Sequence, residues 1–328
     1  MRAAYYERTG PADEVLVVGE LPDPVPQPGE VRVQMQWSGV NPSDVKSRSG
    51  SRGPELPFPR IVPHSDGMGV IDAVGEGVDR SRVGERVWTW NAAWNRANGT
   101  AAQFVVLPEG QAVSLPNGVA GEVGACLGIP ALTALHAVLT DGGVKDQRVL
   151  VAGGAGAVGH YAIQFARLLG ASQVVATVSN ADKAALAREA GATSVIDYRT
   201  QDVVRSVLDV TSGAGVDRII EVDIAANALI DLEVIRREGV LVVYGSGARL
   251  LTLPFSPLIV NNVLARFFIV YHLSAGDRQR AILLLYDWLL SGALKHNIAA
   301  RYALGQIAQA HSMVEQGRAV GNVVLSID

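Results

Sequence analysis

The fold of this chain is decided by the stretch VLVAGGAGAVG, residues 149–159. Four apolar residues predict a buried strand, and the residues after them form a G-x-G-x-x-G pattern at Gly154, Gly156 and Gly159. A helical spacing of apolar residues follows, so the glycines lie between a strand and a helix, which is the context that dinucleotide binding requires. Gly154 permits the tight turn, Gly156 lets the backbone reach a pyrophosphate, and Gly159 lets helix and strand pack closely. We interpret the stretch as a dinucleotide-binding turn with the phosphates at the helix N-terminus; the alternative is a merely tight glycine turn.

The segments after this turn repeat the alternation of strand and helix. Buried strands are predicted at residues 174–178, 194–196, 217–220 and 240–243, and helices at residues 158–169, 182–189 and 203–210. Apolar strands that alternate with helices are typical of a parallel sheet covered on both faces. The pattern therefore indicates a doubly wound α/β fold.

The first 120 or so residues are β-rich instead. Strands are predicted at residues 31–37, 69–75, 86–90 and 103–107. After about Val270 the chain predicts a long amphipathic helix near residues 278–290, a shorter one near 305–316 and a terminal strand at 323–327. This tail is too short to be a domain, so we expect it to return to the first domain, with the dinucleotide-binding unit as an insertion.

Composition excludes several classes of partner. The 328 residues carry a formal net charge of −4, which offers no global attraction for nucleic acid or acidic membranes. No apolar run reaches the roughly 18 residues that a membrane span requires, and the first residues lack the apolar core of a signal peptide. We therefore expect a cytoplasmic protein without nucleic-acid or membrane partners. The single cysteine, Cys126, excludes an internal disulfide and a thiolate-based zinc site within one chain.

The residues after the second strand of the alternating region select the cofactor. NAD sites usually place a carboxylate there to bind the ribose hydroxyls, but this chain has Ser179 and Asn180, with Lys183 one turn further on. A hydroxyl and an ammonium attract a 2′-phosphate, whereas a carboxylate repels it. We expect the nearby acid, Asp182, in the first turn of a helix. The segment favours NADPH over NADH, with an ordinary solvated lysine as the alternative for Lys183.

Further motifs follow one another along the whole chain. They are SGVNPSD at residues 38–44, DGMGVI at 66–71 continuing to Val74-Gly75, GIPALTA at 128–134, IDYR at 196–199, and Gly321. Together with the glycine turn, they make the chain resemble the zinc-free quinone oxidoreductase (zeta-crystallin-like) branch of the medium-chain dehydrogenase/reductase superfamily.

This resemblance implies a GroES-like β-rich catalytic domain formed by residues 1–122 and 268–328. A Rossmann NADPH-binding domain, residues 123–267, is inserted between them, and the cofactor would lie in the cleft between the domains. The resemblance also implies a homodimer joined through the edge strand of the Rossmann sheet, here residues 266–270. By its residues alone, that run is equally well a buried strand.

The resemblance also implies that no metal is bound. Zinc-dependent members of the superfamily have cysteine at the position of Asn41 and histidine at the position of Ser65, and their third ligand falls near residues 128–130, which offer no ligand side chain. We expect His64, one residue from a ligand position, to be a loop or cleft histidine.

Three residues are the candidate catalytic groups. The asparagine that matches Asn41 faces the substrate in the family, so its amide is expected to donate to a carbonyl oxygen; the alternative is that Asn41 caps the Asn-Pro turn. Lys46 stands where several members have a tyrosine in the substrate cleft. In the cleft, Lys46 would attract an acidic substrate or donate to an oxyanion. The alternatives are a surface lysine and a solvated ion pair with Asp44. Thr133 is expected to contact the nicotinamide region. The residues expected to bind the cofactor are Thr133, Gly154, Gly156, Ala157, Val158, Gly159, Ser179, Lys183, Tyr198, Gly245, Ser246, Tyr271 and Asn322.

The function expected from these features is NADPH-dependent reduction of quinones or α,β-unsaturated carbonyls by hydride transfer without zinc. Reduction of such substrates leaves an enolate or phenolate, which hydrogen-bond donors can stabilise. Two alternatives remain: a zinc-independent alcohol or carbonyl dehydrogenase, and a non-enzymatic NADPH-binding protein of the crystallin-like or nucleic-acid-binding kind.

Overall fold

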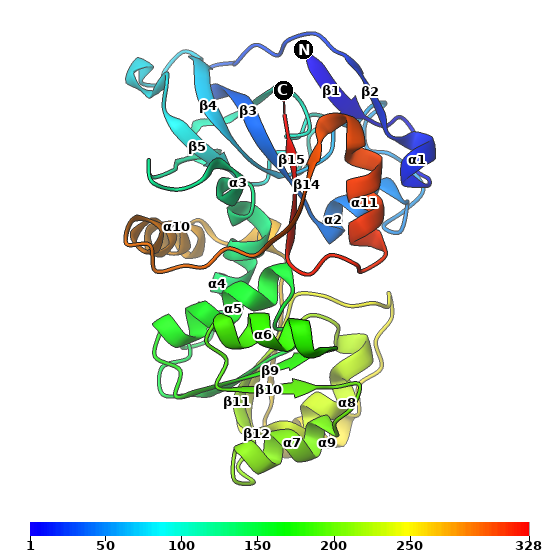
Figure 1. The fold of residues 1–328 in the computed structure, drawn as a ribbon, viewed down its shortest axis with the longest axis vertical. Coiled ribbons are helices and arrows are strands. Elements are labelled where there is room, and N and C mark those ends of the chain that lie inside the picture. The colour runs from blue at the N-terminus through cyan, green and yellow to red at the C-terminus, as the bar shows by residue number, and fades with distance from the viewer. Residues whose placement is uncertain (328) are drawn as a thin grey trace. The chain divides into compact units, whose positions relative to one another are not determined.

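A six-stranded parallel sheet lies at the centre of residues 131–281 in the computed structural model, which describes residues 1–327 (Figure 1). Its strand order is β10-β9-β8-β11-β12-β13, and every pair is parallel. The strands are β8 (Arg148–Val151), β9 (Gln173–Val178), β10 (Ser194–Asp197), β11 (Val216–Glu221), β12 (Ile235–Val243) and β13 (Leu264–Phe267). The predicted doubly wound parallel sheet is confirmed, and its order reverses between β8 and β11, where such folds bind nucleotides.

Helices cover both faces of this sheet. Figure 1 shows α5 and α6 on one side and α7 and α8 on the other. The helices of this part of the chain are α4 (Leu132–Leu139), α5 (Ala157–Leu168), α6 (Ala181–Glu189), α7 (Val203–Val210), α8 (Ile224–Val234) and α9 (Phe255–Val260). The strands are apolar because both of their faces are buried: Val149, Val175 and Ile219 are fully buried, each on a different strand.

Residues from both ends of the chain share a second, mostly antiparallel sheet. Its order is β14-β15-β3-β4-β5-β7, with β6 paired to β3. The strands are β3 (Glu30–Val40), β4 (Asp66–Val74), β5 (Arg86–Thr89), β6 (Phe104–Pro108), β7 (Ala112–Ser114), β14 (Ile298–Ala303) and β15 (Asn322–Ser326). A two-stranded sheet of β1 (Arg2–Tyr5) and β2 (Val17–Glu20) accompanies it. Because β15 pairs antiparallel with β3, the last strand completes the sheet that the N-terminal residues begin.

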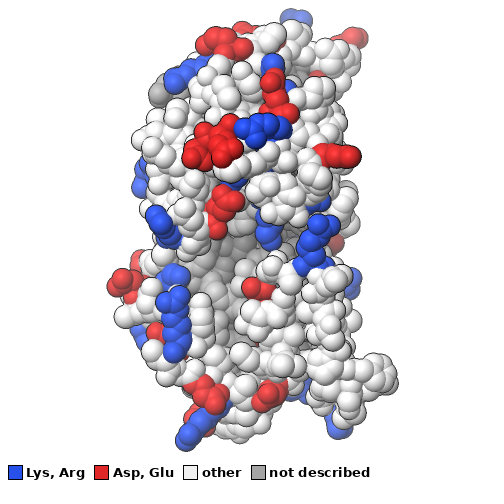
Figure 2. Space-filling model, turned by 90° about the vertical axis from the view of Figure 1, so that its right-hand side faces the viewer, with Lys and Arg blue, Asp and Glu red and all other residues white. Residues whose placement is uncertain are grey.

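The chain thus forms two units. The first unit is Met1–Pro130 with Ile282–Asp328, and the second unit is Ala131–Ala281. The remaining helices are α1 (Ala12–Val15), α2 (Pro42–Arg48), α3 (Gly121–Gly124), α10 (Ala275–Leu290) and α11 (Ile307–Glu315). None of the helices within residues 1–327 is both long enough and apolar enough to cross a membrane. On the face drawn in Figure 2, acidic and basic side chains are interspersed rather than gathered by sign.

Candidate active site and nucleotide-binding site

The glycine turn between β8 and α5 is built so that side chains cannot fit. A Cβ on Gly154 would lie 2.7 Å from the Cβ of Ala176, and a Cβ on Gly159 would lie 2.3 Å from the carbonyl oxygen of Gly153. Gly156 is the N-cap of α5, so the N–H groups of Ala157, Val158 and Gly159 fall in the first helical turn, where no intrahelical partner exists. The turn therefore offers unpaired donors and the positive end of the helix dipole to an anion.

A cavity of about 300 Å³ adjoins this turn at the carboxyl ends of β8, β9 and β11. It is lined by Leu150, Ala152, Gly153, Thr177, Tyr198, Val203, Glu221, Val222, Asp223, Ala226, Asn227, Ile230 and Asp231. Tyr198, a predicted cofactor residue, thus belongs to this cavity and is about half exposed. Burial raises the pKa of both Glu221 and Asp231, which favours a neutral carboxyl group in this acidic pair. Mostly apolar walls with a few polar groups are typical of a small-molecule pocket.

Ser179 and Lys183 are brought together at the end of β9. The Lys183 Nζ donates to the Ser179 Oγ over 2.9 Å, and Ser179 is almost completely buried. Asn180 caps α6 by accepting the backbone N–H of Lys183 at 2.9 Å. Asp182 lies in the first turn of α6, as predicted. A hydroxyl and an ammonium therefore lie side by side where the predicted 2′-phosphate would bind.

The loop after β12 is fixed against the end of β11. Gly247 donates its N–H to the Asp223 Oδ1 at 2.6 Å, and the Ser246 Oγ donates to the Ala248 carbonyl at 2.9 Å. A Cβ on Gly245 would lie 2.1 Å from the Val222 carbonyl oxygen, so only glycine allows this approach. The predicted residues Gly245 and Ser246 therefore form a tight loop that follows directly after a strand of the parallel sheet.

Three other predicted cofactor residues are buried in their own units. Thr133 is buried on α4, and Tyr271 is buried in the short turn Val270–His272. Asn322 begins β15, where its side-chain Nδ2 donates to the Asn297 carbonyl at 3.0 Å. Burial restricts the movement of these three side chains, and one amide hydrogen of Asn322 is already donated to a carbonyl of the first unit.

Asn41 lies in the first unit, between the end of β3 and the start of α2. Its side chain and that of Asp44 form a reciprocal capping box, in which the Asp44 Oδ2 accepts the Asn41 backbone N–H at 2.8 Å. The Asn41 Nδ2 donates to the Asp66 Oδ2 at 2.9 Å, and the same oxygen accepts the N–H of Ile129 at 2.9 Å. The capping alternative for Asn41 is therefore realised, and the Asp44 carboxyl group also lies within reach of the Asn41 amide.

Two buried carboxyl groups flank Asn41. Burial raises the pKa of Asp66 well above its usual value and raises that of Asp44 to about 7. Lys46 is exposed on α2, whereas the Asp44 carboxyl group is buried and faces the Asn41 N–H. Asp44 is therefore not solvated, because helix capping draws this carboxyl group inward.

A chain of hydrogen bonds runs from Asp66 through the interior of the first unit to α11. The Thr100 Oγ1 donates to the Asp66 carbonyl at 2.5 Å, so Thr100 must accept the Ser38 hydroxyl hydrogen over their 2.8 Å contact. Ser38 then accepts from the Nδ1 of His64 at 2.8 Å, which leaves the His64 Nε2 to accept from the His311 Nε2 at 2.9 Å. Every hydrogen in this chain has one allowed position.

The comparison with known proteins identifies the family. Residues 27–117 match the alcohol dehydrogenase GroES-like domain, and residues 157–285 match the family described as zinc-binding dehydrogenase. A quinone oxidoreductase of Pseudomonas aeruginosa is 30% identical over 319 residues, which cover 95% of each chain. The chain belongs to the quinone oxidoreductase branch of the medium-chain dehydrogenase/reductase superfamily. The predicted GroES-like and Rossmann domain classes are thereby confirmed.

Solved structures agree with this family membership. A structure described as an NAD-dependent alcohol dehydrogenase matches with a TM-score of 0.92 at 29% identity, and each chain is covered completely. A quinone oxidoreductase of Escherichia coli, solved in complex with NADPH, matches with a TM-score of 0.88 at 25% identity, covering 99% of this chain and 100% of that one. Members with this fold therefore include both quinone and alcohol oxidoreductases.

The side chains at the zinc positions of this family member do not fit zinc. Asn41 presents its amide nitrogen to Asp66, and Ser65 has a hydroxyl group where a zinc enzyme needs an imidazole. The third position falls in a π-helical turn, Leu127–Ala131, which contributes no ligand atom from a side chain. Cys126 is buried, donates to the Glu122 carbonyl and has a raised pKa because of burial, which disfavours the thiolate that zinc requires.

The residues that sequence reasoning missed are mainly the partners of Asn41. Asp66 stands in the motif at residues 66–71, and an acid at the start of an apolar strand is a signal of a buried polar contact. His64, expected as a loop or cleft histidine, is fully buried and hydrogen-bonded through both ring nitrogens. His311 had no local signal, because its partner is 247 residues away in the sequence.

Proposed function

We propose that this protein reduces quinones or α,β-unsaturated carbonyls with NADPH, by hydride transfer and without zinc. The observation that carries the proposal is the Ser179–Lys183 pair at the end of β9, beside a glycine turn that excludes side chains. The pair offers a hydroxyl and a cation where an NAD site places a carboxylate. The NADPH complex of the E. coli relative supports the same cofactor.

The second unit supplies the groups that would hold NADPH. Ala157, Val158 and the glycines of the turn would bind the pyrophosphate, and Ser179, Lys183 and Tyr198 would surround the adenosine with its 2′-phosphate. Gly245 and Ser246 would line the nicotinamide ribose, with Thr133, Tyr271 and Asn322 at the nicotinamide end. When bound, NADPH supplies the hydride.

The first unit supplies the group for the developing negative charge. Addition of a hydride to a conjugated carbonyl places charge on the carbonyl oxygen, where the remaining Asn41 N–H would donate. An enolate or phenolate needs less stabilisation than an alkoxide, so a neutral amide suffices where a simple ketone would need a metal. Lys46, exposed on α2, would attract an acidic substrate or donate to the same oxygen.

A zinc-independent alcohol dehydrogenase is the second candidate. The full-length match to a structure described as an NAD-dependent alcohol dehydrogenase favours it. The decisive experiment titrates NADPH and NADH by fluorescence and then measures turnover of quinones, enones and secondary alcohols, each with and without a chelator. Reduction of quinones or enones with NADPH, unchanged by the chelator, is expected. Alcohol oxidation with NAD⁺ as the main activity would establish the second candidate, and tight NADPH binding without turnover would favour a non-enzymatic role.

We also propose that two copies of the chain form a homodimer through the edge strand β13. This strand is the edge of the parallel sheet, and Leu264 and Phe267 on it are about half exposed. The neighbouring α9 exposes Phe255, Ile259 and Val260 as well. An exposed apolar edge strand is a ready surface for pairing with a second copy.

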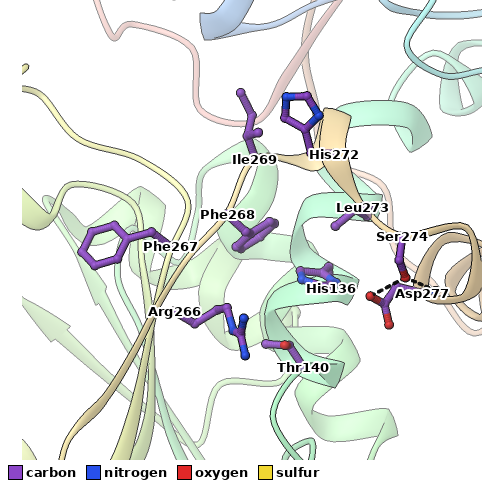
Figure 3. Close-up of a pocket in the computed structure, with 10 residues that line it drawn as sticks. All are labelled: His136, Thr140, Arg266, Phe267, Phe268, Ile269, His272, Leu273, Ser274 and Asp277. Carbon is purple, nitrogen blue, oxygen red and sulfur yellow. Dashed lines mark hydrogen bonds between the residues drawn. The ribbon is translucent and has the colours of Figure 1, made fainter.

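The cavity beside β13 belongs to this same surface. It measures about 690 Å³ and includes Arg266, Phe267, Phe268 and His136 among its lining residues (Figure 3). Phe267→Glu should convert a dimer into a monomer in light scattering, whereas Val83→Glu, at an exposed apolar residue of the first unit, should not. A wild-type monomer at micromolar concentration would contradict the dimer.

A further inference from the structure

We propose that Asp66 is a positioning residue for the reaction: it fixes the orientation of the Asn41 amide so that the amide presents an N–H, and not its oxygen, to the substrate. This inference rests on the proposed function, in which Asn41 stabilises charge on the substrate oxygen. It adds a second residue to that site and gives the site a defined polarity.

The first support is the set of contacts around Asn41. An amide has one oxygen and two N–H donors, and it can rotate by half a turn with little change of shape. The Asn41 oxygen faces the start of α2 in the capping box, and its Nδ2 donates to Asp66. With one hydrogen held by Asp66 and the amide oxygen facing α2, the second hydrogen, which also lies near the Asp44 carboxyl group, is the group of the amide that can turn to a ligand.

The second support is that Asp66 is itself held rigidly. It is fully buried at the start of β4, and the Ile129 N–H donates to the oxygen that also accepts from Asn41. Because the Ile129 N–H also donates to that oxygen, Asp66 is held as an acceptor beside Asn41, which favours the amide orientation with Nδ2 towards it. The amide is therefore prevented from presenting its oxygen, which would repel a developing oxyanion.

The third support is the surroundings of the other Asp66 oxygen. The Oδ1 is buried and has no hydrogen-bond partner within residues 1–327. A Cβ on Gly128 would lie 2.2 Å from it, so the backbone at this position is shaped around a two-oxygen side chain. An unpartnered buried oxygen is unfavourable for folding, so the Asp66 carboxyl group makes its hydrogen bonds through its other oxygen, which holds Asn41 and Ile129.

The test is a double-mutant cycle on kcat for an enone, with NADPH saturating. Asn41→Ala is expected to lower kcat by about 100-fold, as for loss of one oxyanion donor. Asp66→Ala is expected to lower kcat by roughly 10- to 100-fold with little change in the NADPH dissociation constant. Because Asp66 acts through Asn41, the double variant is expected to be no slower than Asn41→Ala alone.

Two further variants separate positioning from structural damage. Asp66→Asn keeps an oxygen for Asn41 and Ile129 and should restore kcat to within about threefold of wild type. Thr100→Val removes the hydrogen bond to the Asp66 backbone and disturbs the same interior without touching Asn41, so its melting temperature should fall while kcat is kept. If Asp66→Ala does not fold, Asp66→Leu, which fills similar space but offers Asn41 no acceptor, takes its place in the cycle with Asn41→Ala.

The outcomes are distinct. Strictly multiplicative losses in the Asn41 and Asp66 variants, or an Asp66→Ala enzyme with wild-type kcat, would overturn the inference while the proposed function stands. An Asn41→Ala enzyme with the kcat of wild type would also overturn the inference. A wild-type protein that reduces no quinone or enone would overturn the proposed function first and the inference with it.

Discussion

The two candidate sites of this molecule are built in opposite ways. In the second unit, the turn proposed to bind the phosphates is one continuous stretch whose backbone N–H groups would contact the anion. It requires positions without a side chain, as at Gly154 and Gly159. In the first unit, Asn41 is held by Asp66, and Asp66 in turn by Ile129, three segments that are far apart in the sequence. A local site depends on space, whereas a site assembled from distant segments depends on a network of satisfied hydrogen bonds.

The largest effect should come from filling space in the turn. Gly159→Ala places a methyl group 2.3 Å from a backbone oxygen, and backbone cannot move aside cheaply. We expect the NADPH dissociation constant to rise by roughly 100-fold, the upper range of an overpacking cost. The control is Gly118→Ala, where nothing lies within 4 Å. Equal NADPH binding by both variants would show that the turn does not bind the phosphates.

The next effect tests the hydrogen-bonded interior of the first unit. His311→Ala leaves the His64 Nε2 without its donor and opens a cavity, so the free energy of unfolding should fall by about 2–4 kcal/mol. Urea denaturation measures the loss, and Gln309→Ala at an exposed position of the same helix is the control. Wild-type stability of the histidine variant would mean that the chain of hydrogen bonds does not form.

The same histidines should make stability sensitive to acid. Burial lowers the pKa of His64 to about 3 and that of His311 well below its usual value. Below about pH 6.5 the unfolded chain binds protons that the folded chain does not, so stability falls by about 1.4 kcal/mol per pH unit for each histidine. His311→Phe should therefore show a shallower decline than wild type between pH 6.5 and 4. Parallel stability curves for the two proteins would contradict the buried neutral state.

A smaller effect should separate the two nicotinamide cofactors. Lys183→Ala removes the cation beside Ser179, so NADPH should bind roughly 10-fold more weakly, the size of one charge-assisted hydrogen bond, while NADH binding is unchanged. Arg188→Ala, at an exposed position of the same helix, is the matched control. If Lys183→Ala weakens both cofactors equally, the lysine does not recognise the 2′-phosphate.

The smallest effect should come from Lys46. Its side chain is exposed on α2, so its field is screened by water. Lys46→Ala should lower kcat/KM for quinones or enones by about two- to threefold, the scale of an exposed charge. Steady-state constants equal to those of wild type would remove Lys46 from the site.

The sequence by itself determined the parts of the protein that are local. The strand-turn-helix around Gly154–Gly159 was predictable because its constraints act between neighbouring residues, and the strand periodicities predicted the parallel sheet and the terminal strand. The Ser179–Lys183 pair was also predictable, because two residues that are four positions apart at the start of a helix lie next to each other.

Only the tertiary structure decided the surroundings of Asn41 and the exposure of β13. An apolar run such as residues 264–270 fits a central strand and an edge strand equally, and only the sheet order made it an edge. Asp66, Ile129, His64 and His311 meet because β4, a π-helical turn and α11 fold together, and no spacing in the sequence encodes such contacts. Burial then sets the protonation of these groups, because desolvation is a property of the folded interior and not of any residue alone.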